Sequence, residues 1–342
     1  MADSLPSLTR TLDDQFTETW QEIQTEAIDN ILDASPITAM LRRMGVFTTQ
    51  TGGDIITRTI RYGKKTAAAI SEGDVLPQGV PKLKTQARWT WRYIASDIER
   101  SVIEDQQNAG KYRIISYVED RLGAARDGLE EKLEDNFTSA IVTGETGNEM
   151  QSLHDLVPPV ASRSTGTYGG IARPGAYTTQ TNGTAVPTTT NTNPWWGPKY
   201  LGASTDPEIT LVDDMTVLFN TVSNNKQSPN MIVSDQSLFE KYEGFGQDAT
   251  QIVKDAGAMA VDLGFTVQRF KGVPWIWTED FTAEHMVMLN TSFIELVYDP
   301  QLWFEMTEWK PIALQGERIA HIFLALNLIG TQPRRHGRLE YS

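Results

Sequence analysis

The fold of this protein is decided by residues 111–142, which read KYRIISYVEDRLGAARDGLEEKLEDNFTSAIV. Apolar residues recur there at steps of three and four, and this spacing places them in one stripe along an α-helix. The stripe consists of Ile115, Val118, Leu122, Ala125, Leu129, Leu133, Phe137 and Ile141. At a rise of about 1.5 Å per residue the helix is about 45 Å long, much longer than an average globular helix. We therefore expect the rest of the chain to be arranged around it.

Two glycines interrupt this helix. Gly123 and Gly128 lie within it, and each costs about 1 kcal/mol of helix stability relative to alanine. They indicate a bend or a close backbone contact. A coiled coil is the alternative reading, but the strict heptad spacing that coiled coils need is absent.

The composition limits the classes of function. The chain has 342 residues, 39% of them hydrophobic, so it forms one elaborate domain or two ordinary ones with a real core. The net charge of −14 argues against a general nucleic-acid binder, because phosphate contacts need a basic surface, and it favours solubility. The absence of cysteine excludes disulfides, thiolate metal sites and a cysteine nucleophile. The start lacks the basic and apolar regions of a signal peptide, and no apolar run is long enough for a membrane span.

The chain before the long helix divides into two parts. Residues 1–50 are predicted to form an arm with short helices, one of them beginning at Pro36. Strands are expected at residues 54–62 and 86–94, and a loop rich in lysine, glycine and proline joins them. Such a long loop is uncommon inside a compact domain. We therefore predict a projecting hairpin, with a poorly ordered loop as the alternative.

The chain after the long helix begins with residues rich in glycine, threonine and asparagine. The segment 177–193 has few apolar residues, so we expect a partly mobile surface loop whose end is fixed by Trp195 and Trp196. A mixed α/β pattern follows from residue 206. Helices are expected at 209–223 and 235–242, and strands at 231–233, 264–270, 273–277, 286–290, 293–298, 301–310 and 317–329. The segment 333–338 is predicted to be a small basic patch.

A search for catalytic and metal-binding motifs finds none that is complete. The sequence has no Walker loop, no G-x-S-x-G and no H-E-x-x-H. Its histidines, which lack ligand spacing and are expected to be structural, are His154, His285, His321 and His336. The pairs Glu130-Glu131 and Glu134-Asp135 could bind a divalent cation, but a solvated helix face explains them more simply. We predict no catalytic residue, no cofactor, no metal and no enzymatic activity.

Charge is distributed unevenly between the hairpin and the long helix. The helix carries Glu119, Asp120, Asp127, Glu130, Glu131, Glu134 and Asp135. Several of these are like-charge i,i+4 pairs near the helix C-terminus, where they are unfavourable. The hairpin region supplies Arg58, Arg61, Lys64, Lys65, Lys82, Lys84, Arg88 and Arg92. Our hypothesis is that the basic hairpin lies on the acidic helix face, of its own subunit or of a neighbour. The alternative is two solvated surfaces that never meet.

The order of these parts resembles the major capsid proteins of tailed phages, which have the Hong Kong ninety-seven-like fold. The resemblance covers nearly the whole chain, and three local patterns support it. They are Gly169-Gly-Ile171 followed by Trp195-Trp196, Phe270-Lys-Gly-Val-Pro-Trp-Ile-Trp277, and Pro333-Arg-Arg-His-Gly-Arg-Leu339. The spacer before Trp195 is longer than the pattern leads us to expect, so residues 177–193 resemble an insertion.

The resemblance implies an α+β fold in six parts. These are an N-terminal arm (1–50), an extended β-hairpin loop (51–100), a peripheral domain with a spine helix (101–150), a Gly/Thr/Asn-rich surface insertion (151–205), an α/β axial domain (206–295), and returning strands with a C-terminal tail (296–342). Some relatives crosslink a loop lysine to a neighbour's asparagine. We expect no such crosslink, because nothing in the sequence indicates it.

The resemblance also implies a function. Many copies, as pentamers and hexamers, would form an icosahedral shell around double-stranded DNA without sequence-specific binding. Separate scaffolding, portal and decoration proteins are possible partners. The protein would belong to the virion, assemble in the host cytoplasm and contact no membrane. Two alternatives stay open, namely a phage decoration or surface protein and a hydrolase with an unrecognised site.

Overall fold

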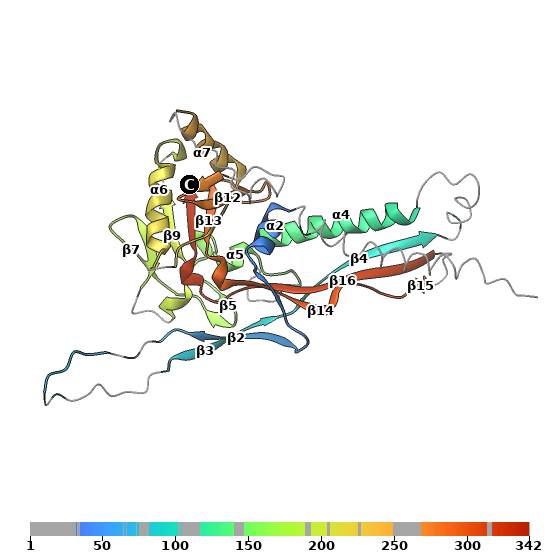
Figure 1. Cartoon of the computed structure of the whole chain (residues 1–342), viewed down its shortest axis with the longest axis horizontal. Coiled ribbons are helices and arrows are strands. Elements are labelled where there is room, and N and C mark those ends of the chain that lie inside the picture. The colour runs from blue at the N-terminus through green and yellow to red at the C-terminus, as the bar shows by residue number, and fades with distance from the viewer. Residues whose placement is uncertain are drawn as a thin grey trace, which may run out of the picture.

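The computed structural model describes residues 32, 35–63, 65, 67–72, 74, 82–101, 103, 117–139, 147–188, 193–203, 206–224, 227–248, 268–312 and 317–341. Most of the predicted arm, residues 1–31, therefore lies outside the described residues. The described chain mixes helices and strands, in agreement with the predicted α+β class. Its strands form one sheet of five, one sheet of eight and two small two-stranded sheets. Figure 1 shows an elongated molecule with the eight-stranded sheet at one end.

The five-stranded sheet forms the elongated half of the molecule. Its strands are β1 (Phe47–Thr49), β4 (Arg92–Ser101), β14 (Ile294–Met306), β15 (Lys310–Pro311) and β16 (Glu317–Gly330). The long strand β16 pairs antiparallel with β14 on one side and with β4 on the other. Its second half is buried on both faces from Leu324 to Gly330, as predicted, whereas its first half alternates between buried and half-exposed residues.

The long helix α4 (Tyr117–Thr138) packs beside β4. The predicted apolar stripe is confirmed, because Leu122, Leu129, Leu133 and Phe137 are each 2% exposed or less. Residues 104–116 and 140–146, which include both predicted ends, lie outside the described residues. Of the two readings of the glycines, a bend or a close backbone contact, the close contact is not found among the described residues. A Cβ atom placed on either would meet no other atom within 4 Å, so the glycines face open space.

The eight-stranded sheet forms the other half. In spatial order its strands are β11 (Gln268–Phe270), β12 (Val273–Trp277), β10 (Met231–Ser234), β13 (His285–Leu289), β17 (Gly337–Tyr341), β9 (Lys199–Ala203), β8 (Thr184–Pro187) and β7 (Tyr177–Thr179). Two helices, α6 (Pro207–Val222) and α7 (Gln236–Asp248), bury their apolar sides in the core of this half. Asp235 caps α7 as predicted, since its carboxylate accepts from the backbone N–H of Ser237 and Leu238 at 3.3 and 3.4 Å.

The segment 177–193, predicted as a partly mobile surface loop, contains two strands that the sequence analysis did not predict. They form the hairpin β7–β8, which extends the eight-stranded sheet beyond β9. Tyr177 fixes the hairpin, because its ring lies 5.4 Å from that of Tyr200 and Arg163 stacks over it at 4.9 Å. The segment forms strands despite its low apolar content, because Tyr177 anchors it and threonine favours strands. Within the predicted part 151–205, Trp196 and Tyr200 are fully buried.

Three predicted strands differ from the structure in their bounds. The strand expected at 86–94 is two strands of different sheets, β3 (Lys84–Thr90) and β4, separated at Trp91. The Trp91 indole fixes this corner by donating to the carbonyl of Gly53 at 2.6 Å. The strands expected at 293–298 and 301–310 form the single strand β14, with a bulge between Tyr298 and Trp303. The boundaries predicted for the six parts of the chain remain predictions.

The remaining elements are short. Helix α2 (Pro36–Arg43) begins at Pro36 as expected, and Gly45 follows it at a φ of 70°. Helix α5 (Leu153–Leu156) starts with a capping box between Ser152 and Asp155. Strands β5 (Thr167–Tyr168) and β6 (Ile171–Ala172) form a small hairpin. Turns of 3-10 helix lie at Val160–Ser162, Pro194–Trp196, Thr291–Phe293 and Pro333–Arg335.

Candidate functional site

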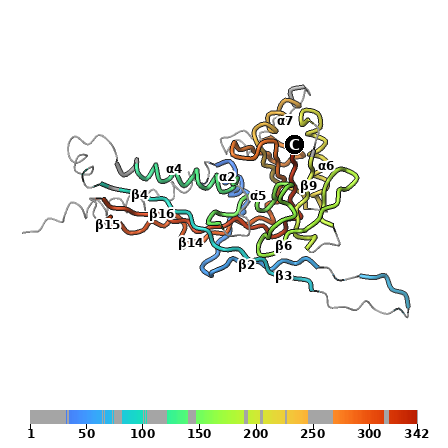
Figure 2. Tube along the Cα trace, turned by 180° about the vertical axis from the view of Figure 1, so that it is seen from behind, coloured from blue at the N-terminus to red at the C-terminus, as the bar shows by residue number. Residues whose placement is uncertain are grey.

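The hairpin of β2 (Ile55–Arg61) and β3 is the most prominent projection of the molecule. Its strands pair antiparallel from Ile55–Thr90 to Arg61–Lys84. In Figures 1 and 2 the hairpin runs along one side of the body, and in Figure 1 the described loop residues 67–72 lie beyond the end of the body that carries β7. The described loop residues 67–72 are all exposed. The predicted pairing of the two strands as a hairpin is confirmed, and the extended loop at its tip remains a prediction.

One face of the hairpin is fixed to the body by a glycine contact. Gly169 has a φ of 59°, and a Cβ atom there would lie 2.7 Å from the Trp89 ring. The carbonyl of Gly169 also accepts from the backbone N–H of Arg88 at 2.9 Å. Trp89 is 1% exposed and packs edge-on against Tyr168, with ring centroids 5.8 Å apart. The glycine therefore lets the body approach a hairpin tryptophan at van der Waals distance.

The tryptophan pair completes this attachment. The Trp196 indole donates to the Tyr168 carbonyl at 2.9 Å and is fully buried. The Trp195 ring stacks on Tyr62, which directly follows β2, with centroids 4.7 Å apart and planes 14° apart. Residues Gly169-Gly-Ile171 and Trp195-Trp196 thus form a platform under the base of the hairpin. The sequence identified both motifs but gave no indication that they meet there.

Two of the predicted basic residues bond within their own chain. Arg58 Nε donates to Glu295 Oε2 at 2.8 Å, and its Nη1 donates to Gln50 at 3.0 Å. Arg92 is buried and donates to the carbonyl of Gly147. Both side chains therefore have partners within their own subunit.

The remaining described cations lie on the exposed face of the hairpin. The register places Arg61 directly opposite Lys84, and Arg88 opposite Thr57. Lys65 and Lys82 are exposed on the loop, and Lys64 lies outside the described residues. Two like charges opposite each other on a strand pair are unfavourable. Among the described residues no carboxylate pairs with Arg61, Lys84 or Arg88, so this face is cationic without compensation inside the subunit.

The acidic residues of α4 divide into two groups. Asp127, Glu131 and Asp135 are exposed in one i,i+4 row. Glu130 and Glu134 are partly buried, and burial raises the pKa of both carboxyl groups. Thr278 donates to Glu134 at 3.2 Å. The side chains of Glu119 and Asp120 are not among the parts of the chain that the structure describes.

The structure does not bring the basic and acidic sets together within one subunit. In Figures 1 and 2 the strands β4, β16 and β14 lie between α4 and the hairpin. The exposed cations of the hairpin and the exposed carboxylates of α4 form no ion pair with each other in the described parts of the chain. The predicted contact therefore stays a hypothesis about two different copies.

A buried polar cluster surrounds Arg338. This residue belongs to the predicted basic patch, but that prediction is wrong for Arg338, whose side chain is 0% exposed. It bonds to Glu340 at 2.7 Å, to His154 Nδ1 at 2.7 Å and to His285. Burial and the neighbouring Arg338 charge lower the pKa of His154 to about 3, so His154 is neutral. Through these contacts Arg338 links strand β17 to strand β13 and to helix α5.

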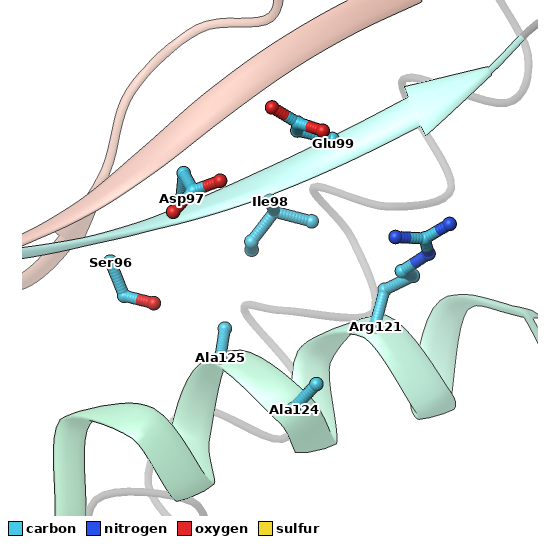
Figure 3. Close-up of a pocket in the computed structure, with 7 residues that line it drawn as sticks. All are labelled: Ser96, Asp97, Ile98, Glu99, Arg121, Ala124 and Ala125. Atoms are coloured by element: carbon cyan, nitrogen blue, oxygen red, sulfur yellow. The ribbon is translucent and has the colours of Figure 1, made fainter.

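A cleft of about 220 Å³ lies between β4 and α4. Figure 3 shows Ile98 and Ser96 directed toward the helix, Arg121 rising from the helix, and Glu99 on the other side of the strand. Across the described residues, no group of three His, Cys, Asp or Glu side chains could hold a metal ion. No helix in that part of the chain is long and apolar enough to cross a membrane.

Comparison with solved structures connects this geometry to known assemblies. A chain of the cyanophage A-1(L) capsid has 15% sequence identity and a TM-score of 0.57, over 88% of this chain and 92% of that one. The capsid of a native GTA particle gives 10% identity and a TM-score of 0.55, over 88% and 90%. The mature capsid of bacteriophage PhiM1 gives 11% and 0.52, over 86% and 85%. This chain has the tailed-phage major capsid fold.

This chain therefore shares its fold with these capsid chains without close sequence similarity to them. No model of a protein family matches the sequence, and no curated protein matches it. The fold predicted from the order of helices and strands is confirmed over most of the chain. The agreement covers nearly the whole length of each capsid chain, so it includes both sheets rather than a shared fragment.

Proposed function

We propose that this protein is the major capsid protein of a tailed phage and that many copies assemble into an icosahedral shell around double-stranded DNA. The observation that carries the proposal is the capsid fold over 88% of the chain. The projecting hairpin supports it, because an exposed hairpin held rigidly at its base is suited to contact a neighbouring copy. Closed symmetric shells need such repeated contacts between copies.

The proposal includes the location and the partners of the protein. It places the chain in the virion, after assembly from pentamers and hexamers in the host cytoplasm. Portal, scaffolding and decoration proteins are candidate partners. The net charge of −14 is consistent with a shell that encloses DNA without sequence-specific binding. The role is structural rather than enzymatic.

We also keep the hypothesis that the cationic hairpin binds carboxylates of another copy. The partner expected from the sequence is the acidic face of α4, and the exposed residues limit it to Asp127, Glu131 and Asp135. Attraction between exposed charges weakens as salt rises, because the screening length shortens from about 10 Å at 0.1 M to about 3 Å at 1 M. An assembly that depends on these charges is therefore expected to be sensitive to salt.

Electron microscopy of the purified protein tests the function. The full chain, expressed alone and with the genes that flank its own, is expected to give closed shells or rings of five and six subunits. The matched control replaces loop residues 63–83 by a short Asn-Gly turn. This variant should remain folded, since the described residues 67–72 are exposed, but it should give no shells.

The two alternatives predict different results. A decoration or surface protein would remain monomeric or form small oligomers and would bind to shells made of another protein. A hydrolase would remain unassembled and would turn over a substrate. A wild-type chain that never forms rings or shells, alone or with the flanking genes, would refute the proposed function.

A further inference from the structure

The short helix α5 connects the two halves of the molecule. Figure 1 shows it between the long helix α4 and the eight-stranded sheet. The side chains of Leu153 and Leu156 are fully buried in a core that also contains Leu133 of α4 and Val287 of β13. We call the contact of residues 153–160 with the strands β13 and β17 the α5 joint.

Arg338 of β17 holds the α5 joint together through polar contacts. Its Nη1 donates to His154 Nδ1 at 2.7 Å and to the carbonyl of Val157 at 3.1 Å, and its Nη2 donates to His285 Nδ1. A guanidinium group donates hydrogen bonds and accepts none. The Nδ1 atom of each histidine is therefore an acceptor, and both imidazole rings are neutral with their proton on Nε2.

Proton uptake would break these contacts at the bonded atoms themselves. A neutral imidazole with its proton on Nε2 takes up the second proton at Nδ1. That is the atom that accepts from Arg338 in both His154 and His285. Protonation therefore removes the acceptor and places a second positive charge beside the guanidinium group.

The surroundings of His154 offer nothing that would stabilise its charged form. The side chain is buried, its ring stacks on Phe281 at 5.0 Å, and its Nε2 has no hydrogen-bond partner among the described residues. The charged or titratable groups that act on it are Arg338 and His285, and both oppose a further positive charge. Burial and these two neighbours lower the pKa of His154 to about 3.

His285 lies nearer the surface, with 16% of its side chain exposed. Its Nδ1 is 3.9 Å from a Glu340 carboxylate oxygen, but burial and the Arg338 charge prevail and lower the pKa of His285. The charged groups that face it are Arg338, Glu340, Asp235, Glu284 and, through its ion pair with Glu284, Lys241. Both histidines of the joint are therefore neutral at neutral pH and take up protons below their ordinary pKa of 6.5.

A second polar contact between the halves has the opposite response to pH. Thr278, which follows β12, donates to the Glu134 carboxylate of α4 at 3.2 Å. Burial and the nearby carboxylates of Asp280, Glu130 and Asp135 raise the pKa of Glu134 despite this hydrogen bond. A raised pKa means that the folded state takes up this proton more readily than the unfolded state. Acid therefore weakens the α5 joint without weakening the contact at Glu134.

We infer that the α5 joint is a pH-sensitive device, in which proton uptake by His154 and His285 detaches residues 153–160 from β13 and β17 while the contact of Glu134 with Thr278 keeps the two halves together. The device belongs to the single subunit and goes beyond the proposed function, which concerns assembly. It gives the two halves a second, looser connection at acid pH.

Proton linkage gives the size of the effect. The pKa of His154 is about 3 in the closed joint and returns to the ordinary 6.5 when the ring reaches solvent. Between neutral pH and about pH 4.5, this single proton shifts the equilibrium toward the detached form by about a hundredfold. His285 shifts it further in the same direction, because its pKa is also lowered in the closed joint.

Amide hydrogen exchange of the unassembled full chain tests the inference. Exchange is followed by mass spectrometry at about pH 7.5 and about pH 4.5, with labelling times scaled for the change in the intrinsic exchange rate. Peptides from residues 153–160 and 337–341 should lose protection by about tenfold or more at the lower pH. Peptides from residues 130–138 of α4 and 324–330 of β16 should keep theirs. Unchanged protection of 153–160, or an equal loss in all four segments as in ordinary acid unfolding, would overturn the inference.

Substitution of the two histidines assigns the response. Glutamine offers an oxygen that accepts from Arg338 and takes up no proton, so a chain with His154→Gln and His285→Gln should keep residues 153–160 protected at about pH 4.5. The single variant His285→Gln, at the more exposed position, should reduce the loss and serves if circular dichroism shows that the double variant does not fold. A full wild-type loss of protection in a folded variant would refute the role of these histidines.

The other two histidines provide matched controls. His321 of β16 is half-buried outside the joint, so His321→Gln should retain the wild-type loss of protection. His336 is fully buried, and its Nδ1 accepts from the backbone N–H of Asn290 rather than from Arg338. His336→Gln should therefore also retain the loss at residues 153–160. Disappearance of the loss in either control would assign the acid response to that histidine and overturn the inference, whereas the proposed function is decided separately by shell formation.

Discussion

The contact between Gly169 and Trp89 gives the most specific prediction about how the hairpin is held. Replacing Gly169 with alanine adds a Cβ atom 2.7 Å from the Trp89 ring, at a φ of 59°. The left-handed backbone costs about 1–2 kcal/mol for a residue with a Cβ atom. Overpacking of a buried contact adds about 1–3 kcal/mol. We therefore expect Gly169→Ala to lower the free energy of unfolding by about 2–5 kcal/mol.

The neighbouring glycine provides a matched control. Gly170 has a φ of 69°, but a Cβ atom there would meet nothing within 4 Å. Gly170→Ala should therefore cost only the backbone part, about 1–2 kcal/mol. Urea unfolding of the unassembled subunit, followed by tryptophan fluorescence, measures both values. The tryptophan emission of the folded protein should also change in Gly169→Ala but not in Gly170→Ala. Equal losses in the two variants would show that the close approach of Gly169 to Trp89 does not hold the hairpin.

Two further predictions concern stability. Gly123→Ala and Gly128→Ala should each raise the free energy of unfolding by about 1 kcal/mol, because both positions are helical and face open space; a loss in urea unfolding would instead reveal a contact or bend that needs glycine. The folded pKa of His154 is lowered to about 3 from an ordinary 6.5. Its contribution to stability is therefore complete above pH 6.5 and is lost as the pH falls from 6.5 toward 3, because the unfolded state binds the proton first. His154→Gln should flatten the pH dependence of the urea midpoint over this range, whereas an unchanged slope would assign the acid sensitivity to other groups.

The sequence by itself determined the features that depend on local spacing. Apolar residues recur at steps of three and four along α4, and Leu122, Leu129 and Phe137 belong to the buried stripe that this spacing defines. The sequence predicts this stripe because helix periodicity is a property of the chain alone. The projecting hairpin followed from two strand patterns and a loop too long for a compact connection. The order of these parts was enough to indicate the capsid fold, which the solved capsids share at 15% identity or less.

Only the tertiary structure decided which distant residues meet. Trp91 is one member of an alternating pattern, and only its bond to Gly53 marks the corner where the chain leaves one sheet for another. Arg338 looks like a surface cation in the sequence, yet it is fully buried, and two of its partners, His154 and His285, come to it from other segments. Asp97 and Glu305 are 208 positions apart, and they share a face because β16 pairs with both of their strands. Sheet pairing is non-local, so the spacing of residues along the chain carries no record of it.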